Sequence, residues 1–287
     1  MPEHVHIIGA GVVGSATGRA LASVGHQVSF VDVNEDRVAT MAAEGFGAST
    51  SLQLPGDRST VVLLSVPTPS TGSSYDLSIM EDAARSAGRA FAADPHPHVV
   101  VVRSTVTPTF CDTLLTPWLE ESSSKRAGED FFVVSAPEFL REDRALDDAL
   151  NPWVTVVGAH DENARQRVAE VFAPLGGKEA IFDNPTVAEM IKIVHNCFNA
   201  AKISFWNEIW RLCEHLGVDQ RQVGQTVAMS AEGSFNPSYG IKGGYPYGGA
   251  CLPKDLDGLL GLGAAQGVEL PLLAAVKVVN QMLAEGR

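Results

Sequence analysis

The feature that most constrains the fold is a regular alternation of short apolar runs with helical stretches, over roughly the first 180 residues of this 287-residue chain. The apolar runs predict strands at Val5–Ile8, Gln27–Asp32, Thr60–Val66, His98–Arg103, Phe131–Ser135, Trp153–Val157 and Glu179–Phe182. Helical patterns lie between them at Val12–Val24, Glu35–Glu44, Leu77–Phe91, Thr109–Glu121 and Glu162–Ala173. Because near-continuously apolar runs are typical of strands covered on both faces, the alternation predicts an α/β fold with a doubly wound parallel sheet.

The pattern changes near Asp183, and from Thr186 to Leu216 neither Gly nor Pro interrupts the chain. Apolar residues recur there at helical spacing, which predicts one long helix of roughly 30 residues, opened by a capping box of Thr186 with Glu189. Further helical segments follow at Asp219–Met229, Lys254–Gly267 and Leu270–Ala284. We therefore expect two domains: residues 1–184 with the sheet, and an all-helical domain of residues 185–287.

The composition argues against several classes of protein. The formal net charge is −13, which disfavours nucleic acid as a partner because phosphate binding depends on basic clusters. The four cysteines form neither a CxxC pair nor a His/Cys set with zinc-ligand spacing, so we expect no metal site. The N-terminus lacks the pattern of a signal peptide and no apolar run is long enough to span a bilayer, so we expect a cytoplasmic protein without membrane contact.

A glycine-rich segment, Gly9-Ala10-Gly11-Val12-Val13-Gly14, directly follows the first predicted strand and opens the first helix. Such glycines allow a tight turn and let backbone N–H groups approach a pyrophosphate, so Gly9, Gly11, Val12 and Val13 are candidate cofactor contacts. Asp32 ends the second predicted strand. A carboxylate there accepts hydrogen bonds from a ribose diol and repels a 2′-phosphate, which predicts a Rossmann domain that binds NAD rather than NADP.

Two loops follow later predicted strands. They are Val66-Pro67-Thr68-Pro69 and Arg103-Ser104-Thr105-Val106. Ligands of open α/β sheets bind at the carboxyl ends of the strands, so Val66, Pro67, Thr68, Ser104 and Thr105 are further candidate contacts. Taken alone, each loop is more often a strand cap than a ligand contact.

Three later segments carry residues with catalytic chemistry: Ala136–Glu142 (APEFLRE), Glu189–Lys192 through Asn207-Glu208, and Gly248–Asp255 (GGACLPKD). Together with GAGVVG, VPTP and STV they resemble the UDP-glucose/GDP-mannose dehydrogenase family, in the same order and at similar spacings from about Val5 to Asn280. Enzymes of this family oxidise a primary alcohol to a carboxylate in two NAD-dependent steps. The resemblance therefore implies an NAD-dependent dehydrogenase.

The resemblance makes Cys251 the nucleophile, which would form a thiohemiacetal with an aldehyde and then a thioester. Elementary chemistry agrees, because a thiolate attacks an aldehyde readily, and a position after glycines and before a predicted helix favours both access and thiolate formation. Lys192 and Asn196 would stabilise oxyanions. Their spacing of four residues places both on one face of a helix, where they can converge on one oxygen.

The resemblance also gives roles to four other residues. Asp255 would assist Lys192 or position water, and Glu138 would help the hydrolytic step. Glu142 and Thr105 would line the site beside the cofactor.

The chain departs from the family pattern in ways that bear on the substrate. The family usually has a third domain that closes over the nucleotide half of its substrate; this chain ends at Arg287, so we expect that domain to be absent. The family's phosphate-binding Arg before the cysteine has no counterpart in Phe235-Asn236-Pro237. We therefore expect NAD-dependent oxidation of an alcohol on a smaller sugar or nucleoside-like substrate, and expect UDP-glucose to be a poor one.

Three alternatives stay open. The chain could be a nucleotide-sugar dehydrogenase whose third domain is supplied by another chain or was removed. It could be a non-catalytic NAD-binding paralogue, although the retention of Cys251, Lys192, Asn196, Asp255 and Glu138 argues against this. A 3-hydroxyacid dehydrogenase has a similar fold but needs no cysteine nucleophile, so GGACLPKD argues against that activity.

The long predicted helix carries more aromatic residues than one face of a small helical domain would bury: Phe198, Phe205, Trp206 and Trp210. We therefore expect a homodimer through this helix, as the resemblance also implies. Cys197 and Cys213 occupy its apolar positions and are expected in the core. His195 has no evident partner and is expected on the helix surface or at the rim of the substrate site.

Overall fold

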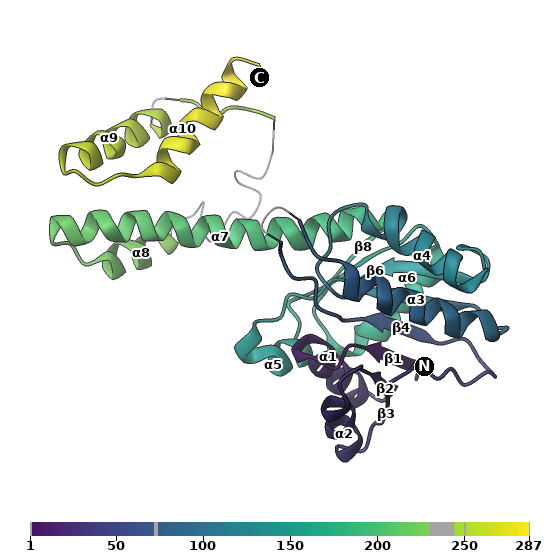
Figure 1. The fold of residues 1–287 in the computed structure, drawn as a ribbon. Helices are drawn as coiled ribbons and strands as arrows, with labels where there is room; N and C mark the ends of the chain where they lie inside the picture. Colours follow the sequence, from purple (N-terminus) through teal and green to yellow (C-terminus); the bar gives the residue numbers. More distant parts are fainter. Residues whose placement is uncertain (1, 72–73, 230–243, 250, 287) are drawn as a thin grey trace. The chain divides into compact units, whose positions relative to one another are not determined.

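The computed structural model describes residues 2–71, 74–229, 244–249 and 251–286, except for the side chain of Asp255. The chain divides into two compact units, Met1–His195 and Asn196–Arg287, and each is described by itself (Figure 1). The division falls inside the long helix, so the first turns of that helix belong to the unit that contains the sheet.

The first unit contains an eight-stranded sheet with the order β3-β2-β1-β4-β5-β6-β7-β8 (Figure 1). The strands are β1 (His4–Ile8), β2 (Gln27–Val31), β3 (Gly47–Ser49), β4 (Val61–Leu64), β5 (His98–Val102), β6 (Phe131–Ser135), β7 (Val154–Gly158) and β8 (Lys178–Phe182). The sequence did not predict β3, because three residues are too few to show a periodicity. The strand order reverses between β1 and β4, which is where sheets of this kind bind ligands.

The sheet is parallel, as predicted, except between β6 and β7. These two strands are antiparallel and pair only through Ser135 and Gly158. The connection between them contains α5 (Ala145–Leu150), a helix of six residues. A parallel neighbour needs a crossover that carries the chain back along the whole sheet, and so short a helix does not provide one.

Helices cover both faces of the sheet, which confirms the doubly wound fold (Figure 1). Besides α5 they are α1 (Val12–Ser23), α2 (Glu35–Ala43), α3 (Ser78–Ala93), α4 (Thr116–Ser123) and α6 (Glu162–Phe172). Successive strand residues alternate between two cores: Leu63 packs with Leu21 and Val168, whereas Leu64 packs with Phe91. Burial on both faces explains why the strands are apolar throughout.

The second unit is helical in its described residues. It contains the later part of α7 (Pro185–Leu216) with α8 (Gln220–Ala228), α9 (Leu252–Ala265) and α10 (Pro271–Ala284). Leu212 and Leu273 lie in its core. The carboxylate of Glu208 accepts hydrogen bonds from the N–H groups of Leu272 at 2.5 Å and Leu273 at 3.2 Å. Glu208 of α7 thus satisfies the first N–H groups of α10, which its own N-cap residue leaves without a side-chain partner.

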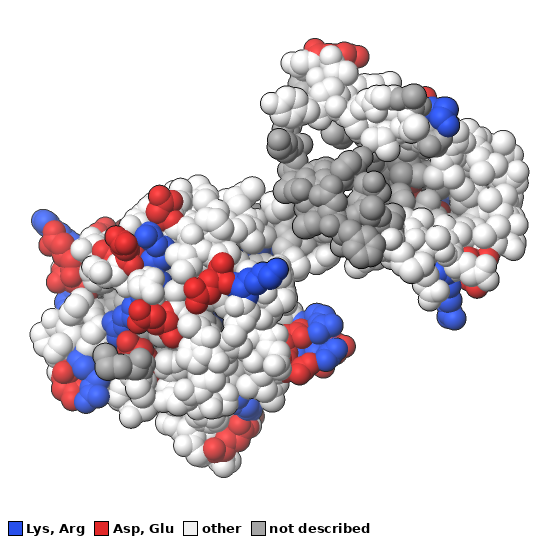
Figure 2. Space-filling model, turned by 180° about the vertical axis from the view of Figure 1, so that it is seen from behind, with Lys and Arg blue, Asp and Glu red and all other residues white. Residues whose placement is uncertain are grey.

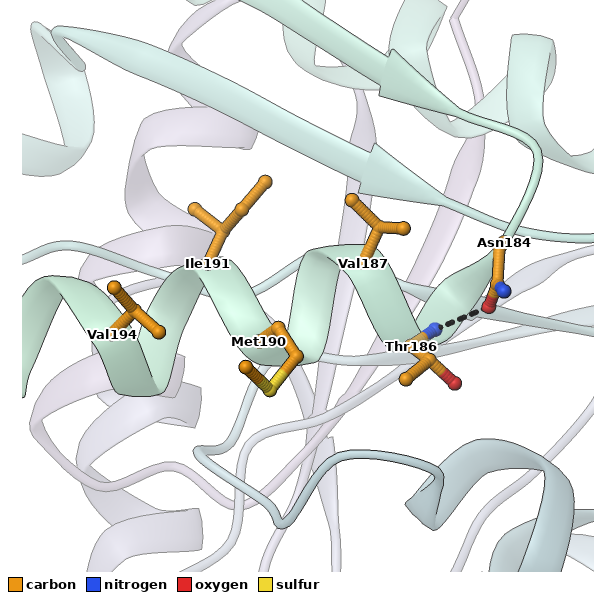
Figure 3. A pocket seen from close by; sticks show the side chains of 6 residues that line it. All are labelled: Asn184, Thr186, Val187, Met190, Ile191 and Val194. Carbon is orange, nitrogen blue, oxygen red and sulfur yellow. Dashed lines mark hydrogen bonds between the residues drawn. The ribbon is translucent and has the colours of Figure 1, made fainter. Parts of the chain in front are cut away.

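The helix α7 begins at Pro185, and the predicted capping box of Thr186 with Glu189 is wrong. Figure 3 shows Asn184 in that role: its Oδ1 accepts a hydrogen bond from the N–H of Thr186 at 2.8 Å. Proline at the first helical position has no N–H that needs a partner, so the residue before it can complete the cap.

The carboxylate of Glu189 is used elsewhere. It is 2% exposed and accepts a hydrogen bond from the N–H of Cys111 at 2.9 Å. Cys111 opens a π-helical turn, Cys111–Leu115, that leads into α4. The helix predicted at Thr109–Glu121 therefore begins with this turn. This hydrogen bond joins the Glu189 side chain of α7 to the backbone of Cys111, 78 positions away in the sequence.

The surface carries both signs of charge. On the face in Figure 2, acidic and basic side chains of the described residues are interspersed over the first unit. None of the described helices combines the length and the apolar composition needed to cross a membrane.

His6 in β1 should make the first unit sensitive to acid. Its Nδ1 lies 2.7 Å from Ser29 Oγ, and burial, with the nearby His4 and His98, lowers the pKa of His6 from 6.5 to about 4. The unfolded chain binds a proton near pH 6.5, whereas the folded chain does so only near pH 4. The contribution of His6 to the free energy of unfolding is therefore fully present above pH 6.5, the pKa of His6 in the unfolded chain. It falls as the pH drops, and the loss reaches about 3 kcal/mol at pH 4.

Urea unfolding measured across this pH range tests the expectation. The variant His6→Gln should lose less stability on acidification than the unaltered chain. His160→Gln is the control, because the His160 side chain is 62% exposed. Identical pH dependence with and without His6 would contradict the expectation.

Candidate functional site

The glycine-rich turn joins β1 to α1. Gly9 has a φ of 99° and donates its N–H to Val31 O at 2.8 Å. A Cβ at Gly9 would lie 2.5 Å from Ser65 O, and a Cβ at Gly14 would lie 1.8 Å from Gly9 O. These two glycines therefore permit close backbone packing. Gly11 is the N-cap of α1, and no atom lies within 4 Å of where its Cβ would be. The open space at Gly11 suits a pyrophosphate that approaches the helix N-terminus.

A cavity of about 790 Å³ is located at this edge of the sheet. Ten of the predicted cofactor contacts line it: Gly9, Gly11, Val12, Val13, Asp32, Val66, Pro67, Thr68, Ser104 and Thr105. Glu138 lines the same cavity. Glu142 is not among its lining residues; it is exposed on the short turn Glu142–Arg144, and its role stays a prediction.

Asp32 follows β2 and is held rigidly in the cavity wall. Its Oδ2 accepts a hydrogen bond from the N–H of Ala10 at 2.7 Å, and its Oδ1 accepts one from the N–H of Asn34 at 2.9 Å. Arg37, in the first turn of α2, places Nη1 3.4 Å from Oδ2. The carboxylate is thus fixed beside the glycine turn with an exposed cation next to it.

The loops after β4 and β5 are fastened to each other. Thr68 Oγ1 donates to Thr105 O at 2.7 Å, and Ser104 Oγ donates to Val66 O at 2.6 Å. Each hydroxyl binds a carbonyl of the other loop. The two segments therefore form one wall of the cavity, and the hydroxyls act as strand caps as well as lining residues.

Lys192 and Glu138 form a buried ion pair in the first unit. Lys192 Nζ lies 3.1 Å from Glu138 Oε1, with the side chains 7% and 12% exposed. Glu138 Oε2 accepts a hydrogen bond from the N–H of Leu140 at 2.5 Å. The ammonium also lies 5.4 Å from the centroid of the Phe139 ring. Each charged group therefore has two contacts that fix its orientation. Such fixed groups suit proton transfer or the stabilisation of an oxyanion beside a cofactor.

The expectation that His195 has no partner is wrong. Its ring stacks on Trp153 at 5.7 Å between centroids and meets Phe139 edge-to-face at 5.1 Å. Burial and the nearby Lys192 ammonium lower the pKa of His195. The imidazole is therefore neutral at pH 7. The partners lie far away in the sequence, so no local pattern predicts them.

The second unit contains the remaining predicted catalytic residues. Cys251 is the N-cap of α9 and is exposed, and Asn196 in α7 is exposed as well. Asp255 lies in α9, and its side chain is outside the described part. Phe235-Asn236-Pro237, where the sequence lacks the family's Arg, also lies outside the described residues.

The two cysteines of α7 differ from each other. Cys213 is 7% exposed and belongs to the core of the second unit, as predicted. Cys197 is exposed, so its prediction as a core residue is wrong. The apolar periodicity of α7 extends beyond the part of the helix that this core covers, which explains the error.

Sequence reasoning missed three basic residues of the cavity wall, Arg37, Arg89 and Arg103. Arg37 had a local signal, since it lies in the first turn of the helix that follows Asp32. Arg103 stands in a quoted motif but had no assigned role. Burial lowers its pKa to about 10, so it remains a cation at neutral pH.

Comparisons with known proteins agree with the motifs. A model described as the NAD binding domain of the UDP-glucose/GDP-mannose dehydrogenase family matches residues 3–47 and 41–176, and the model of the central domain matches residues 186–282. A UDP-glucose 6-dehydrogenase of Haloferax volcanii is 36% identical over 96% of this chain and 68% of its own length. A GDP-mannose 6-dehydrogenase of Azotobacter vinelandii is 33% identical over the same shares. A ternary complex of GDP-mannose dehydrogenase from Pseudomonas aeruginosa has a TM-score of 0.87 and 31% identity, with 98% of this chain and 69% of that chain covered.

The sheet order, the open glycine turn and the fixed carboxylate of Asp32 define a Rossmann-type dehydrogenase. The domain matches and the relatives then settle the family. The chain belongs to the UDP-glucose/GDP-mannose dehydrogenase family. It is an NAD-dependent oxidoreductase that acts on a CH–OH group.

Replacing Asp32 by Ala should relax the preference for NAD over NADP by at least about tenfold, because a fixed carboxylate repels a 2′-phosphate and Arg37 would remain to attract it. Titration of both cofactors into each variant measures this. Asp36→Ala is the matched control, since Asp36 is exposed in the first turn of α2, beside Arg37, and does not line the cavity. Equal affinities of the unaltered chain for NAD and NADP would contradict the prediction that Asp32 selects NAD.

Proposed function

We propose that this protein oxidises a primary alcohol of a nucleotide sugar to a carboxylate, in two NAD-dependent steps with a covalent intermediate on Cys251. Relatives named for UDP-glucose and GDP-mannose, 36% and 33% identical over nearly the whole chain, support this substrate class. The strongest support for the proposal is the buried ion pair of Lys192 with Glu138. Glu138 also lines the cofactor cavity, so the pair lies beside the expected cofactor. Two oriented groups of opposite charge suit oxyanion stabilisation and water activation.

The glycine turn and the neighbouring Asp32 fit a dinucleotide: Gly11 leaves room for a pyrophosphate, and the Asp32 carboxylate would accept hydrogen bonds from a ribose. When bound, NAD would supply the hydride acceptor, with one molecule consumed in each of the two oxidations. Thr68, Ser104 and Thr105 line the same cavity and would contact the bound cofactor. Glu142 is proposed as a further residue of this site.

Between the two oxidations, the Cys251 thiolate forms a C–S bond with the aldehyde carbon, and the oxyanion takes up a proton to give a thiohemiacetal. The second oxidation leaves a thioester. Water then attacks the thioester carbon, the C–S bond breaks, and the carboxylate and two protons are released with the thiolate restored. We assign Lys192 and Asn196 to the oxyanions and Glu138 to the attacking water. Asp255 would support Lys192 or position that water.

The substrate has a second candidate class, a smaller sugar or nucleoside. It is favoured by the absence of Arg from the stretch Ser230–Lys242, because a charge-assisted hydrogen bond to phosphate contributes roughly 1.5–3 kcal/mol. NADH formation with UDP-glucose, GDP-mannose, free hexoses and nucleosides distinguishes the classes. Efficient turnover of a nucleotide sugar with two NADH per acid supports the proposal; turnover of free sugars or nucleosides alone overturns its substrate class.

We also propose a homodimer through α7. Phe198, Ile203 and Trp210 are 66%, 62% and 51% exposed, whereas Phe205 and Trp206 pack against the core of the second unit. Near the helix start, Val187, Met190, Ile191 and Val194 line an apolar hollow of about 300 Å³ (Figure 3). So much uncovered apolar surface is typical of an interface. A monomeric mass at micromolar concentration, measured by light scattering, would count against the dimer.

A further inference from the structure

Arg103, at the end of β5, is a buried cation that the proposed chemistry does not use. It is 9% exposed, and among the described residues no carboxylate lies within ion-pair distance of it. Its guanidinium lies over the ring of Phe172, 4.9 Å from the centroid. Burial disfavours the cation, and the nearby Glu138 carboxylate favours it. Nη1 makes two hydrogen bonds, whereas Nε is buried without a hydrogen-bond partner among the described residues.

Those hydrogen bonds go to two consecutive carbonyls. Arg103 Nη1 donates to Ala136 O at 2.7 Å and to Pro137 O at 3.1 Å. The N–H of Ala136 still pairs with Val102 O at 3.0 Å, but Pro137 has no N–H, so the strand pairing of β6 ends there. Beyond that point one nitrogen of Arg103 fixes the direction of the chain.

The next residue is Glu138. Its carboxylate binds Lys192 on one side and the N–H of Leu140 on the other. Arg103 and Glu138 both line the cofactor cavity. A backbone that bends differently after Pro137 would move the Glu138 carboxylate away from Lys192.

We propose that Arg103 is a positioning residue that holds Glu138 against Lys192 at the cofactor cavity, acting through the carbonyls of Ala136 and Pro137. The consequence for turnover rests on the proposed function, whereas the consequence for the position of Glu138 does not. A misplacement of about 1 Å can lower a rate about 100-fold, so the role has a measurable kinetic effect.

The first test is structural. In a crystal structure of Arg103→Met, Glu138 and Lys192 should be separated beyond hydrogen-bond distance. In the control Arg165→Met the pair should stay intact, because Arg165 Nη1 donates to another backbone carbonyl, Ala159 O, at 3.1 Å. A Glu138–Lys192 pair that is unchanged in Arg103→Met overturns the proposal, whatever the enzyme's substrate.

The second test is kinetic and uses a double-mutant cycle with Glu138→Gln. Arg103→Met should lower kcat by about 10- to 100-fold in the unaltered chain, but by less than about twofold when Glu138→Gln is already present. Arg103→Lys, which retains one donor, should show a smaller loss with the same dependence on Glu138. Equal losses in both backgrounds would mean a general structural role and would overturn the proposal. An unaltered kcat in Glu138→Gln itself would instead contradict the proposed function.

Discussion

Replacing Cys251 by Ala should lower the rate of carboxylate formation by about 1,000-fold or more, while the affinity for NAD stays unchanged. The alanine has no atom that can form the covalent bond to the aldehyde, so the second oxidation has no thiohemiacetal to act on. NAD affinity should survive because the residues that line the cofactor cavity all belong to the first unit, whereas Cys251 is the exposed N-cap of α9 in the second.

The measurement is product analysis by mass spectrometry, together with NADH per substrate consumed. Cys197→Ala is the matched control, because Cys197 is the other exposed cysteine and has no proposed role. The control should form acid at the unaltered rate. Acid formation by Cys251→Ala at that same rate would show that Cys251 is not the covalent catalyst. A raised KM with an unaltered kcat would instead assign this cysteine to substrate binding.

The residues that local patterns singled out as cofactor contacts lie mostly at single strand–helix junctions, and the structure brings them to one cavity. Gly9 and Gly11 lie between β1 and α1, and Asp32 directly follows β2. The carboxyl ends of parallel strands meet at one edge, so the topology alone brings such residues together. Ten of the predicted contacts line one cavity for this reason.

Interactions between distant segments were not predictable in the same way. Glu189 matches the spacing of a capping box, yet its carboxylate binds Cys111, 78 positions away in the sequence. His195 offered no local partner, because Phe139 and Trp153 reach it from another part of the chain. Arg103 looked like part of a strand cap, and only the three-dimensional structure shows its bonds to the segment before Glu138.

The same limit applies to the energetics of Lys192. The sequence identifies Lys192 only as a lysine on a helix, and its oxyanion role comes from the family resemblance. The helical spacing of the segment fits an exposed lysine as well as a buried one. The structure buries it against a carboxylate and a ring face. Its ammonium therefore affects stability as well as the proposed catalysis, and the two effects can be separated.

Lys192→Met should lower kcat by about 100- to 1,000-fold, because it removes an oriented donor from developing negative charge. It should also lower the free energy of unfolding by about 3 kcal/mol or more, since Glu138 is left as a buried charge without its cation. Lys277→Met is the control: Lys277 pairs with Asp257 at 2.7 Å, but both side chains are about half exposed, so its removal should change stability by about 1 kcal/mol or less.

The double variant Lys192→Met with Glu138→Leu separates the two effects. Replacing both members of a buried ion pair by apolar residues is often neutral for stability, so the double variant should regain most of the free energy of unfolding lost by Lys192→Met. It should regain none of the turnover, because both proposed catalytic groups are gone. Urea unfolding and steady-state kinetics on the same preparations measure the two quantities. Recovery of turnover in the double variant would mean that Lys192 serves only to neutralise Glu138, and the oxyanion role would have to be abandoned.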